Sequence, residues 1–359
     1  MSNAPAGPAD HHELAPVRPG EDLDWATLED YLKARLPDLD GPMTVLQFPN
    51  GSANLTYQLV IGGTRLVLRR PPFGKLAAGA HDMRREHRVL SRLYRSYPRA
   101  PRAVLYCEDE SVIGSRFFVS EYRSGVVVWD RIPDTMSGQA DAGRRIGVAV
   151  VDALADLHLV DPESCDLGDL GWPDGYLERQ LRGWQGRWDA VAREAGTPVE
   201  RVGAALAAQL PVQTRSSIVH NDFKTDNCQF APDDPDVVVS VFDWDMATLG
   251  DPLVDLGTLL NYWPSDDGSS ALAIPGLERL GLPRKDEIVA GYAERSGMAV
   301  DRASVNWYEA FGCWKTAVIM QQLYDRYLRH ETTDPRMAER GAQVQTLGRR
   351  ALGLLGVAE

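Results

Sequence analysis

Two stretches of this 359-residue sequence decide how the rest is interpreted: "VHNDFKTDN" at residues 219–227 and "FDWDMATLGDPLVDLG" at residues 242–257. Each is attached to a run rich in valine, so each is expected to lie where a buried strand ends. Asp and Asn residues at such a place either form surface turns or take part in a site. For a single Asp, the surface-turn interpretation remains an alternative. The combined spacing, with Asp243 sixteen residues after Asn227, favours a site.

The first stretch has the pattern His-x-Asp-x-x-x-x-Asn, and these side chains suit phosphoryl transfer. In that reaction the protein mostly positions groups and neutralises charge. Asp222 can accept or orient the proton of an attacking hydroxyl. Asn227 and Asp243 offer an amide and a carboxylate oxygen, and magnesium prefers one or two carboxylate oxygens together with phosphates and water. The two stretches therefore predict magnesium-dependent phosphotransfer.

The same residues resemble the aminoglycoside phosphotransferase and choline kinase-like superfamily, whose loop reads H-x-D-x-x-x-x-N and whose metal-binding Asp follows on the next strand. "GDPLVDLG" at residues 250–257 is similar to the G-D-P-x-x-D-L stretch of that superfamily, and the likeness runs from roughly Gln47 to Leu260. It implies an α+β, protein-kinase-like, two-lobed fold. The N-lobe is expected to be a small antiparallel sheet with one key helix, and the C-lobe to be larger and mainly helical.

The resemblance also assigns roles in and near the loop. It implies that Asp222 is the catalytic base, that His220 braces the loop, and that Asn227 and Asp243 hold Mg²⁺. Lys224, two residues after the base, either contacts the transferred phosphate or is a solvated surface residue.

Two further carboxylates of the second stretch receive lesser roles. Asp245 is a weaker metal candidate than Asp243. Asp255 is interpreted as a structural residue that anchors the loop through backbone N–H groups rather than as a catalytic one.

Upstream, the resemblance implies a nucleotide site. The small residues of "NGSANLTYQL" would let backbone N–H groups approach the phosphates, although the same residues also suit an ordinary hairpin turn. Backbone groups in "FFVSEYRSG" would meet the purine at a hinge between the lobes. The predicted nucleotide-binding residues are Gly51, Ser52, Ala53, Asn54, Arg69, Glu86, Glu121, Tyr122 and Arg123.

Arg69 departs from the superfamily, which usually has a lysine at the end of the third strand. Arginine keeps the charge and can bind two phosphate oxygens, but with a different geometry. The kinase-like domains associated with acyl-CoA dehydrogenases look similar here, with "LR(R/K)PP". Glu86, in "RREHRVL", is either the ion-pair partner of Arg69 or a solvated helix residue.

Hydrophobic periodicity places these motifs on elements. The first part of the chain predicts helices and strands in the order helix 24–36, strands 43–48, 55–61 and 65–69, helix 81–94, and strands 103–107 and 116–121. The turn pairs "PNGSAN" and "GG" between strands predict an antiparallel meander. The later part predicts helices at 142–160, 175–194, 285–296 and 303–330, and short strands at 218–219, 228–230 and 237–242.

The predicted domains are a disordered leader, 1–22, an N-lobe, 23–123, and a C-lobe, 124–359. The leader is rich in Ala, Pro and Gly and lacks a signal-peptide apolar region, and no stretch approaches the roughly 18 apolar residues of a spanning helix. We therefore expect a cytoplasmic protein without a membrane partner. The formal net charge of −13 also argues against nucleic acid as a partner.

The four cysteines are far apart and show no spacing of a zinc site, so we expect small buried thiols. They are Cys107, Cys165, Cys228 and Cys313. The cofactors that the resemblance implies are Mg²⁺ and ATP or GTP as co-substrate.

The leading hypothesis is a small-molecule kinase that transfers the γ-phosphoryl group to a substrate hydroxyl. The alternative is a nucleotide-binding pseudokinase or scaffold, which Arg69 in place of lysine supports. The acceptor is a hydroxyacyl-CoA-type metabolite, favoured by "RRPP", or an aminoglycoside or choline-like amino alcohol, favoured by the net negative charge. One set of aromatic residues either lines an acceptor pocket or packs in the core: Trp172, Tyr176, Trp184, Trp188, Trp307 and Trp314.

Overall fold

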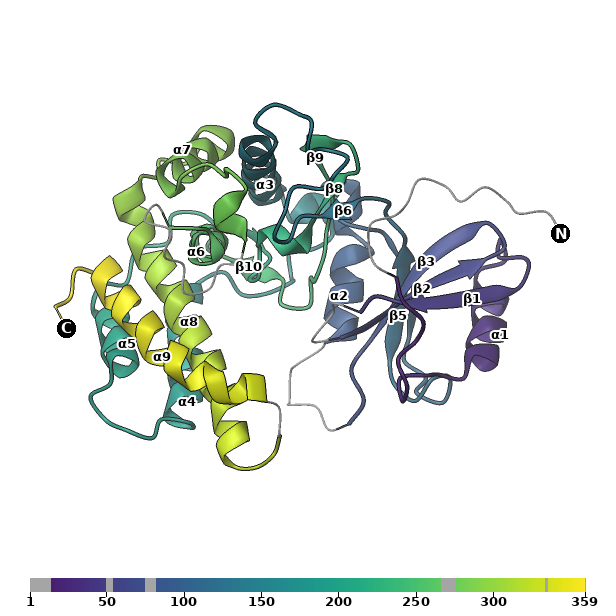
Figure 1. Ribbon diagram of the computed structural model, residues 1–359, viewed down its shortest axis with the longest axis horizontal. Helices are drawn as coiled ribbons and strands as arrows, with labels where there is room; N and C mark the ends of the chain where they lie inside the picture. The colour runs from purple at the N-terminus through teal and green to yellow at the C-terminus, as the bar shows by residue number, and fades with distance from the viewer. Residues whose placement is uncertain (1–13, 50–53, 75–81, 266–275, 333–334, 359) are drawn as a thin grey trace. The chain divides into compact units, whose positions relative to one another are not determined.

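The helices and strands of this chain gather into two units in the computed structural model, which describes residues 14–49, 54–74, 82–265, 276–332 and 335–358 (Figure 1). The first unit comprises Met1–Val128, Ser164–Leu167 and Asp226–Ala247. The second comprises Trp129–Glu163, Gly168–Thr225 and Thr248–Glu359. Asn227 and Asp243 therefore belong to the first unit, whereas Asp222 belongs to the second.

The first unit is built on a five-stranded antiparallel sheet with the strand order β1-β2-β3-β5-β4. Its strands are β1 (Met43–Gln47), β2 (Leu55–Ile61), β3 (Thr64–Arg70), β4 (Ala103–Cys107) and β5 (Phe117–Glu121). Ile61 pairs with Thr64 across a two-residue turn, Gly62-Gly63, and a Cβ at Gly62 would lie 2.2 Å from the Asp40 carbonyl oxygen. Only glycine therefore fits at position 62 of this turn.

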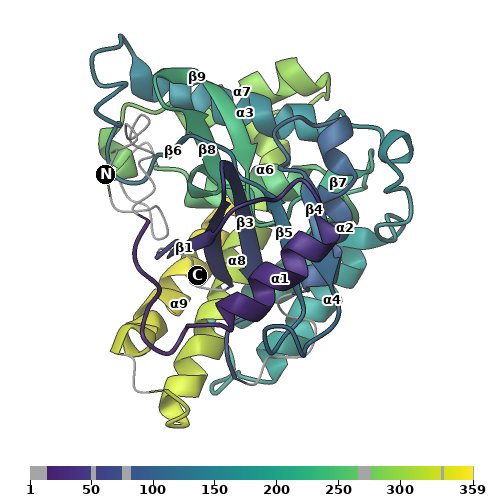
Figure 2. The same ribbon diagram turned by 90° about the vertical axis from the view of Figure 1, so that its right-hand side faces the viewer.

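Two helices of this unit, α1 (Trp25–Arg35) and α2 (Met83–Leu90), pack on different faces of the sheet. Side chains alternate along a strand, so Leu66 and Leu68 of β3 join the core cluster that includes residues of α1, while Arg69 points to the other face. Figure 2 shows α1 lying across one face of the sheet. Glu86 of α2 meets Arg69 on the opposite face.

A smaller three-stranded sheet completes the first unit, in the order β6 (Val126–Val127), β8 (Cys228–Ala231) and β9 (Asp234–Val241). β8 and β9 form an antiparallel pair in which Cys228 lies opposite Val241. The backbone N–H of Phe242 donates to the Asn227 carbonyl at 2.9 Å. This bond places Asn227 opposite Phe242, the residue before Asp243, at the open end of the hairpin.

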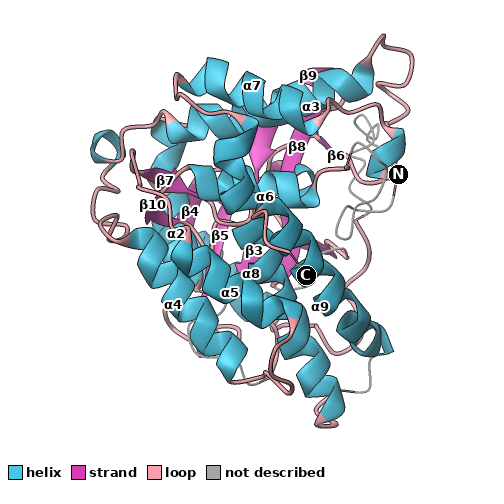
Figure 3. Cartoon of the chain, turned by 90° about the vertical axis from the view of Figure 1, so that its left-hand side faces the viewer, coloured by secondary structure: helices cyan, strands magenta, loops and turns pink. Residues whose placement is uncertain are grey.

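The second unit is mainly helical (Figure 3). α8 is its longest helix among the described residues and packs against α9, α6, α5 and α4. The helices are α3 (Ala142–His158), α4 (Tyr176–Asp189), α5 (Pro198–Ala208), α6 (Leu253–Tyr262), α7 (Lys285–Ser296), α8 (Arg302–Leu328) and α9 (Pro335–Leu354). A two-stranded antiparallel ribbon joins β7 (Ser217–Val219) to β10 (Thr248–Gly250), and short 3₁₀ turns lie at η1 (Leu93–Arg95), η2 (Glu163–Cys165), η3 (Thr225–Asn227) and η4 (Leu277–Arg279).

Most predicted elements are present with shifted ends. The predicted helix 81–94 is interrupted: α2 ends at Leu90, and a 3₁₀ turn, Leu93–Arg95, follows. The predicted helix 175–194 ends earlier, at Asp189. The sequence analysis misses α5, α6, α9, β6 and β10. No described helix has the length and apolar character needed to cross a membrane.

Candidate active site

The loop that follows β7 is held from beneath by Asp255, near the start of α6. One Asp255 carboxylate oxygen accepts the backbone N–H of His220 and the other accepts the N–H of Asn221, both at 2.6 Å. The ring Nε2 of His158 lies 3.2 Å from the same carboxylate. Burial alone would raise the pKa of Asp255, but the hydrogen bonds and charges of His158 and His220 lower it below its ordinary value. Asp255 is therefore an ionised, fully buried anchor.

His220 and Asn221 take their conformations from these contacts. His220 is fully buried, and its Nδ1 accepts the backbone N–H of Asp222 at 3.3 Å. Asn221 has a φ of 67°, in the left-handed region that Asn adopts more readily than most residues. The Tyr176 hydroxyl donates to its side-chain oxygen at 2.8 Å, and Lys315 Nζ donates to its backbone oxygen at 2.9 Å.

Asp222 is the partly exposed carboxylate of this loop. Its side chain is 26% exposed, and Lys224 Nζ lies 3.3 Å from its Oδ2. The Lys224 ammonium also lies 5.3 Å from the centroid of the Tyr262 ring. Lys224 is thus paired with Asp222 rather than solvated alone. The carboxylate is accessible to a ligand, and its backbone is held by buried neighbours.

In the first unit, Arg69 is shared by two carboxylates. Its Nη2 donates to Asp243 Oδ1 at 2.7 Å, and its Nε lies 3.2 Å from Glu86 Oε2. The Arg69–Glu86 ion pair is therefore present, and Glu86 is not solvated: its side chain is 1% exposed. Burial alone would lower the pKa of Arg69, but Glu86 and Asp243 raise it above its ordinary value.

Glu86 sits in the middle of the buried face of α2, where an apolar residue would be expected. Burial raises its pKa to about 8, and the negative charges of Asp243 and Asp245 add to that effect, while Arg69 opposes it. The Nε of Arg69 and the Oε2 of Glu86 form no hydrogen bond within the described structure, although they lie close enough for an ion pair. This network is charged, buried and incompletely hydrogen-bonded.

Asn227 and Asp243 are the side chains that could hold a divalent cation. They are neighbours at the open end of the β8–β9 hairpin, and Asp243 is 30% exposed with a φ of 67°. No group of three or more His, Cys, Asp or Glu side chains gathers for a metal ion in the described residues. An amide and a carboxylate fit magnesium, which takes much of its coordination from phosphates and water. They do not fit zinc.

The remaining predicted nucleotide residues divide into two groups. Gly51, Ser52 and Ala53 lie outside the described residues, whereas Asn54 is described and buried. Glu121, Tyr122 and Arg123 follow one another at the end of β5.

These last residues are held by local contacts. Glu121 accepts from the Arg102 backbone at 2.9 Å and pairs with Arg123 at 2.6 Å, and Arg65 stacks over the Tyr122 ring. Their side chains are thus engaged by neighbouring residues of the first unit.

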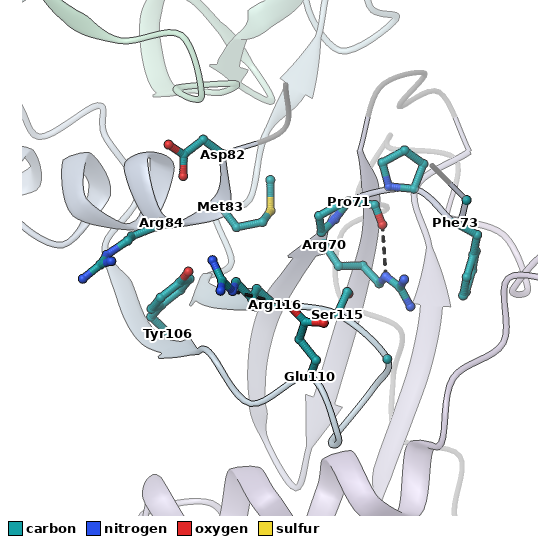
Figure 4. Close-up of a pocket in the computed structure, with 13 residues that line it drawn as sticks. Arg70, Pro71, Phe73, Asp82, Met83, Arg84, Tyr106, Glu110, Ser115 and Arg116 are labelled. Atoms are coloured by element: carbon teal, nitrogen blue, oxygen red, sulfur yellow. Dashed lines mark hydrogen bonds and ion pairs between the residues drawn. The ribbon is translucent and has the colours of Figure 1, made fainter. Parts of the chain in front are cut away.

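A separate pocket of about 560 Å³ opens in the first unit, between the end of β3, the β4–β5 turn and the start of α2 (Figure 4). Its lining includes Arg70, whose guanidinium donates to the Pro71 and Ile113 carbonyls, and Arg116, which pairs with Glu110. Neither Arg69 nor Glu86 is part of this lining. Because the segment 75–81, which follows Gly74 of the lining, lies outside the described residues, we assign the pocket no ligand.

The aromatic residues predicted to line a pocket or to pack in the core are mostly core. Five of them are at most 6% exposed, namely Tyr176, Trp184, Trp188, Trp307 and Trp314. Trp172 differs, with 82% of its surface exposed. The four cysteines are free and buried as predicted, and burial raises the pKa of the Cys228 thiol.

Three residues contact this loop network without having been predicted to do so: His158 and Lys315, which the sequence analysis did not single out, and Tyr176, which it named only as an aromatic residue of an acceptor pocket or of the core. His158 and Tyr176 are dozens of residues upstream of the loop, and Lys315 is 94 residues away from its partner Asn221. One signal was present: each is a polar group on the apolar face of a predicted helix. Buried polar groups need partners, but the sequence alone does not name them.

Residues 44–304 match the model of the phosphotransferase enzyme family, APH. The chain belongs to this family. The match confirms the predicted enzyme class, a phosphotransferase that acts on hydroxyl acceptors, and the predicted kinase-like α+β fold agrees with the solved structures that the chain resembles.

Among its relatives, mouse (Mus musculus) acyl-CoA dehydrogenase family member 11 is 34% identical over 325 residues, which cover 87% of this chain but 41% of that protein. The chain thus spans less than half the length of this relative. A solved Ralstonia eutropha JMP134 protein assigned to the aminoglycoside phosphotransferases is 28% identical, with a TM-score of 0.78 over 93% of this chain and 99% of that one. The GDP complex of aminoglycoside 2'-phosphotransferase-IIIa is 13% identical, with a TM-score of 0.58 over 91% and 99%.

Proposed function

We propose that this chain is a magnesium-dependent small-molecule kinase that transfers the γ-phosphoryl group of ATP or GTP to a substrate hydroxyl. The observation that carries the proposal is the loop itself. Asp222 is partly exposed and paired with Lys224, and the residues before it are fixed by the buried Asp255. A base whose backbone is fixed while its carboxylate stays accessible suits a reaction that depends on positioning.

In this proposal the acceptor oxygen forms a bond to the γ-phosphorus while the bond to the β,γ-bridging oxygen breaks. The hydroxyl proton passes to the Asp222 carboxylate, and the nucleoside diphosphate leaves. Lys224, 3.3 Å from Asp222, lies where its ammonium could meet the negative charge of the transferred group.

On the nucleotide side, Asn227 and Asp243 would hold Mg²⁺, and Arg69 would bind the phosphates. When bound, Mg²⁺ neutralises phosphate charge and helps to orient the transferred group. The donor set supports this assignment, since an amide and a carboxylate suit magnesium. Arg69 already contacts Asp243, so nucleotide binding requires Arg69 to share or exchange this partner.

For the acceptor, we propose a hydroxyacyl-CoA-type metabolite ahead of an aminoglycoside or choline-like amino alcohol. The likeness to an acyl-CoA dehydrogenase family member supports the first, and the likeness to aminoglycoside phosphotransferases supports the second. Near Asp222 lie two lysines, Lys224 and Lys315, whose positive charge disfavours a polycationic acceptor. The predicted lobes, 23–123 and 124–359, and a cytoplasmic location remain proposals from the sequence.

The test is transfer from γ-labelled ATP, with magnesium, to a panel of hydroxyacyl-CoA thioesters, choline and an aminoglycoside. Asp222→Asn should lower kcat by roughly 10²–10⁴-fold, as expected when a general base is lost. Asp286→Asn, at an exposed carboxylate of α7, is the matched control and should leave kcat unchanged. An Asp222→Asn variant with wild-type kcat would remove the proposed base.

The pseudokinase alternative rests on one observation: Arg69 occupies the place of the usual lysine and engages Asp243, a proposed metal ligand. Thermal-shift titration with ATP and magnesium, beside turnover of the wild type and of Arg69→Lys, separates the two functions. Stabilisation by nucleotide with no turnover on any acceptor favours the pseudokinase. Turnover that survives in Arg69→Lys favours the kinase, since either cation then serves.

A further inference from the structure

The peptide bond that joins Asn221 to Asp222 is held at both of its polar ends. Its carbonyl oxygen accepts a hydrogen bond from Lys315 Nζ at 2.9 Å, and its N–H donates to His220 Nδ1 at 3.3 Å. A peptide unit is planar, so fixing its oxygen and its hydrogen fixes the plane and the position of the Asp222 Cα that follows. The direction in which the Asp222 carboxylate leaves the loop therefore depends on these two contacts.

Residue 221 is also fixed from two other helices. Asp255, in α6, binds its N–H at 2.6 Å, and Tyr176, at the start of α4, binds its side-chain oxygen at 2.8 Å. The Tyr176 ring in turn packs on Gly250 of β10, where an added Cβ would lie 2.7 Å from the ring. Left-handed backbone is costly for a residue with a side chain. These contacts keep Asn221 in that conformation, and the hydrogen bond from Lys315 of α8 is the third of them.

Burying the charged Lys315 side chain costs more free energy than a purely structural role requires. Its side chain is buried, with 7% of the residue exposed, and its ammonium has three N–H donors. One donor reaches the Asn221 carbonyl, and no carboxylate lies within ion-pair distance in the described part of the chain. The Trp184 ring centroid is 6.0 Å away, at the limit of a cation–π contact. A methionine would fill the same space without the cost of burying a charge.

We propose that Lys315 is a positioning residue for phosphoryl transfer: it fixes the Asn221–Asp222 peptide and places a buried positive charge near the Asp222 carboxylate. This inference rests on the proposed role of Asp222 as the base. It gives Lys315 two effects on the same group. The hydrogen bond orients the carboxylate, and the ammonium attracts the negative charge beside it.

The charges around Asp222 come from every element of this network. Lys224 and His220 lie on its own loop, Asp255 on α6, Lys315 on α8 and Arg187 on α4. Burial lowers the pKa of Lys315, whereas Asp222 and Asp255 raise it and Arg187 and Lys224 lower it further. Lys315 and Asp222 therefore attract each other, so the ammonium also acts on the group that it positions.

The test compares Lys315→Met and Lys315→Arg with the wild type in steady-state transfer to the best acceptor of the panel. Lys315→Met should lower kcat by roughly 10–100-fold, the scale expected when a reacting group is displaced slightly, while KM for ATP changes less than about threefold. Lys315→Arg retains the charge and a hydrogen-bond donor and should recover part of kcat.

Controls separate positioning from stability. Lys285→Met removes another buried lysine, whose Nζ lies 2.7 Å from Glu309 Oε1. Lys285 takes no part in the loop contacts described above. The variant should lower the melting temperature and leave kcat unchanged. Tyr176→Phe deletes a single hydroxyl contact to Asn221 and should lower kcat about threefold to tenfold in a folded protein, an independent probe if Lys315→Met does not fold.

The outcomes are distinct. If Asp222→Asn is inactive while Lys315→Met and Tyr176→Phe keep the wild-type kcat, the inference is overturned and the proposed function stands. If Asp222→Asn is as active as the wild type, or the wild type transfers no phosphate, the proposed function fails and the inference fails with it. A loss of kcat in Lys315→Met, with partial rescue by Lys315→Arg, supports both.

Discussion

Glu86 and Asp255 are two carboxylates with almost no contact with solvent, yet their surroundings act on them in opposite directions. Asp255 accepts two backbone N–H groups and lies beside His158, and its pKa falls below the ordinary value. Glu86 shares the cation of Arg69 with Asp243, and burial raises its pKa to about 8. The two sites are alike in burial and differ in how completely the charge is compensated.

That difference in charge compensation indicates which network has all of its hydrogen-bond and charge partners and which can still bind a ligand. Asp255 has donors for both of its oxygens, so its network is complete and serves to hold the loop. Around Glu86, one guanidinium serves Glu86 and Asp243 with Asp245 nearby, so negative charge is in excess. An excess of negative charge beside Asn227 and Asp243 is what a site for a divalent cation requires, and this supports the proposed magnesium site.

The largest expected effect is on the completed network. Asp255→Asn should lower the free energy of unfolding by about 3–5 kcal/mol, because an amide N–H₂ would face a buried backbone N–H and an ionic partner of His158 would be lost. Urea unfolding followed by circular dichroism at neutral pH measures this loss. Asp286→Asn, at an exposed carboxylate, is the control and should change it little. A loss below about 1 kcal/mol would show that Asp255 is not the anchor.

The same variant has a defined pH dependence. Because the folded pKa of Asp255 lies below its ordinary 3.8, the stability that this carboxylate contributes is present above that value and is lost as the pH falls through the lower folded pKa. The gap between the wild type and Asp255→Asn should therefore narrow in acid. A gap that widened as the pH fell would contradict the lowered pKa.

Glu86 should show the opposite slope. Its folded pKa is raised from 4.5 to about 8, so between these values the folded state keeps a proton that the unfolded chain has released. Stability is fully present below the ordinary value and declines as the pH rises through about 8. Each pKa unit corresponds to about 1.4 kcal/mol, so the decline across this window of about 3.5 units is at most about 5 kcal/mol.

Glu86→Gln removes that titration while Arg69 keeps Asp243 as a partner. The variant should therefore lose less stability than the wild type as the pH rises, in melting temperatures recorded across the window. Parallel curves for the two proteins would mean that Glu86 is already ionised in the folded state. Glu86 and Asp255 would then no longer differ, because the negative charge of each carboxylate would be fully compensated by its neighbours.

A smaller effect is expected at Arg69. Arg69→Lys keeps one positive charge but replaces a planar group that reaches both Glu86 and Asp243 with a single ammonium. The free energy of unfolding should fall by about 1–2 kcal/mol, the scale of one hydrogen bond to a charged group. Urea unfolding at one pH measures it, with Arg84→Lys, at an exposed arginine of α2, as the control. A loss equal to that of Asp255→Asn would mean that the network around Glu86 is as closed as the one around Asp255.

The sequence predicts the elements and residues whose signals are local. The meander β1–β3 follows from alternation and from "GG" at its turn, and the Arg69–Glu86 pair follows from a charged helix after the third strand. In contrast, α6 is missed because all but its last residue are buried, so no polar face reveals its period. The start of α5 has a local sequence signal that the sequence analysis did not use: Thr197 is its N-cap and Pro198 is its first residue.

The candidate site divides in the same way. His220, Asp222 and Asn227 lie within eight residues, so spacing alone reveals them. Tyr176 and Lys315 reach Asn221 from 45 and 94 residues away, through the packing of α4 and α8. A lone lysine in an apolar helical stretch signals a buried charge, but its partner is set by tertiary structure. The packing that decides whether Glu86 gains a proton is likewise absent from any local pattern.

The smallest effect is expected at an ion pair that has the chemistry of Glu86 without its burial. Lys33 Nζ lies 2.6 Å from Glu29 Oε1 on α1, with about a third of the lysine side chain exposed. Solvent screens this pair, so Lys33→Met should change the free energy of unfolding by about 0.5 kcal/mol or less, and added salt should reduce the effect further. Urea unfolding at low and high salt measures both. A loss equal to that of Arg69→Lys would mean that the pairing of opposite charges alone explains the stability of the Glu86 network. Burial would then explain none of it, although the contrast between Glu86 and Asp255 depends on burial.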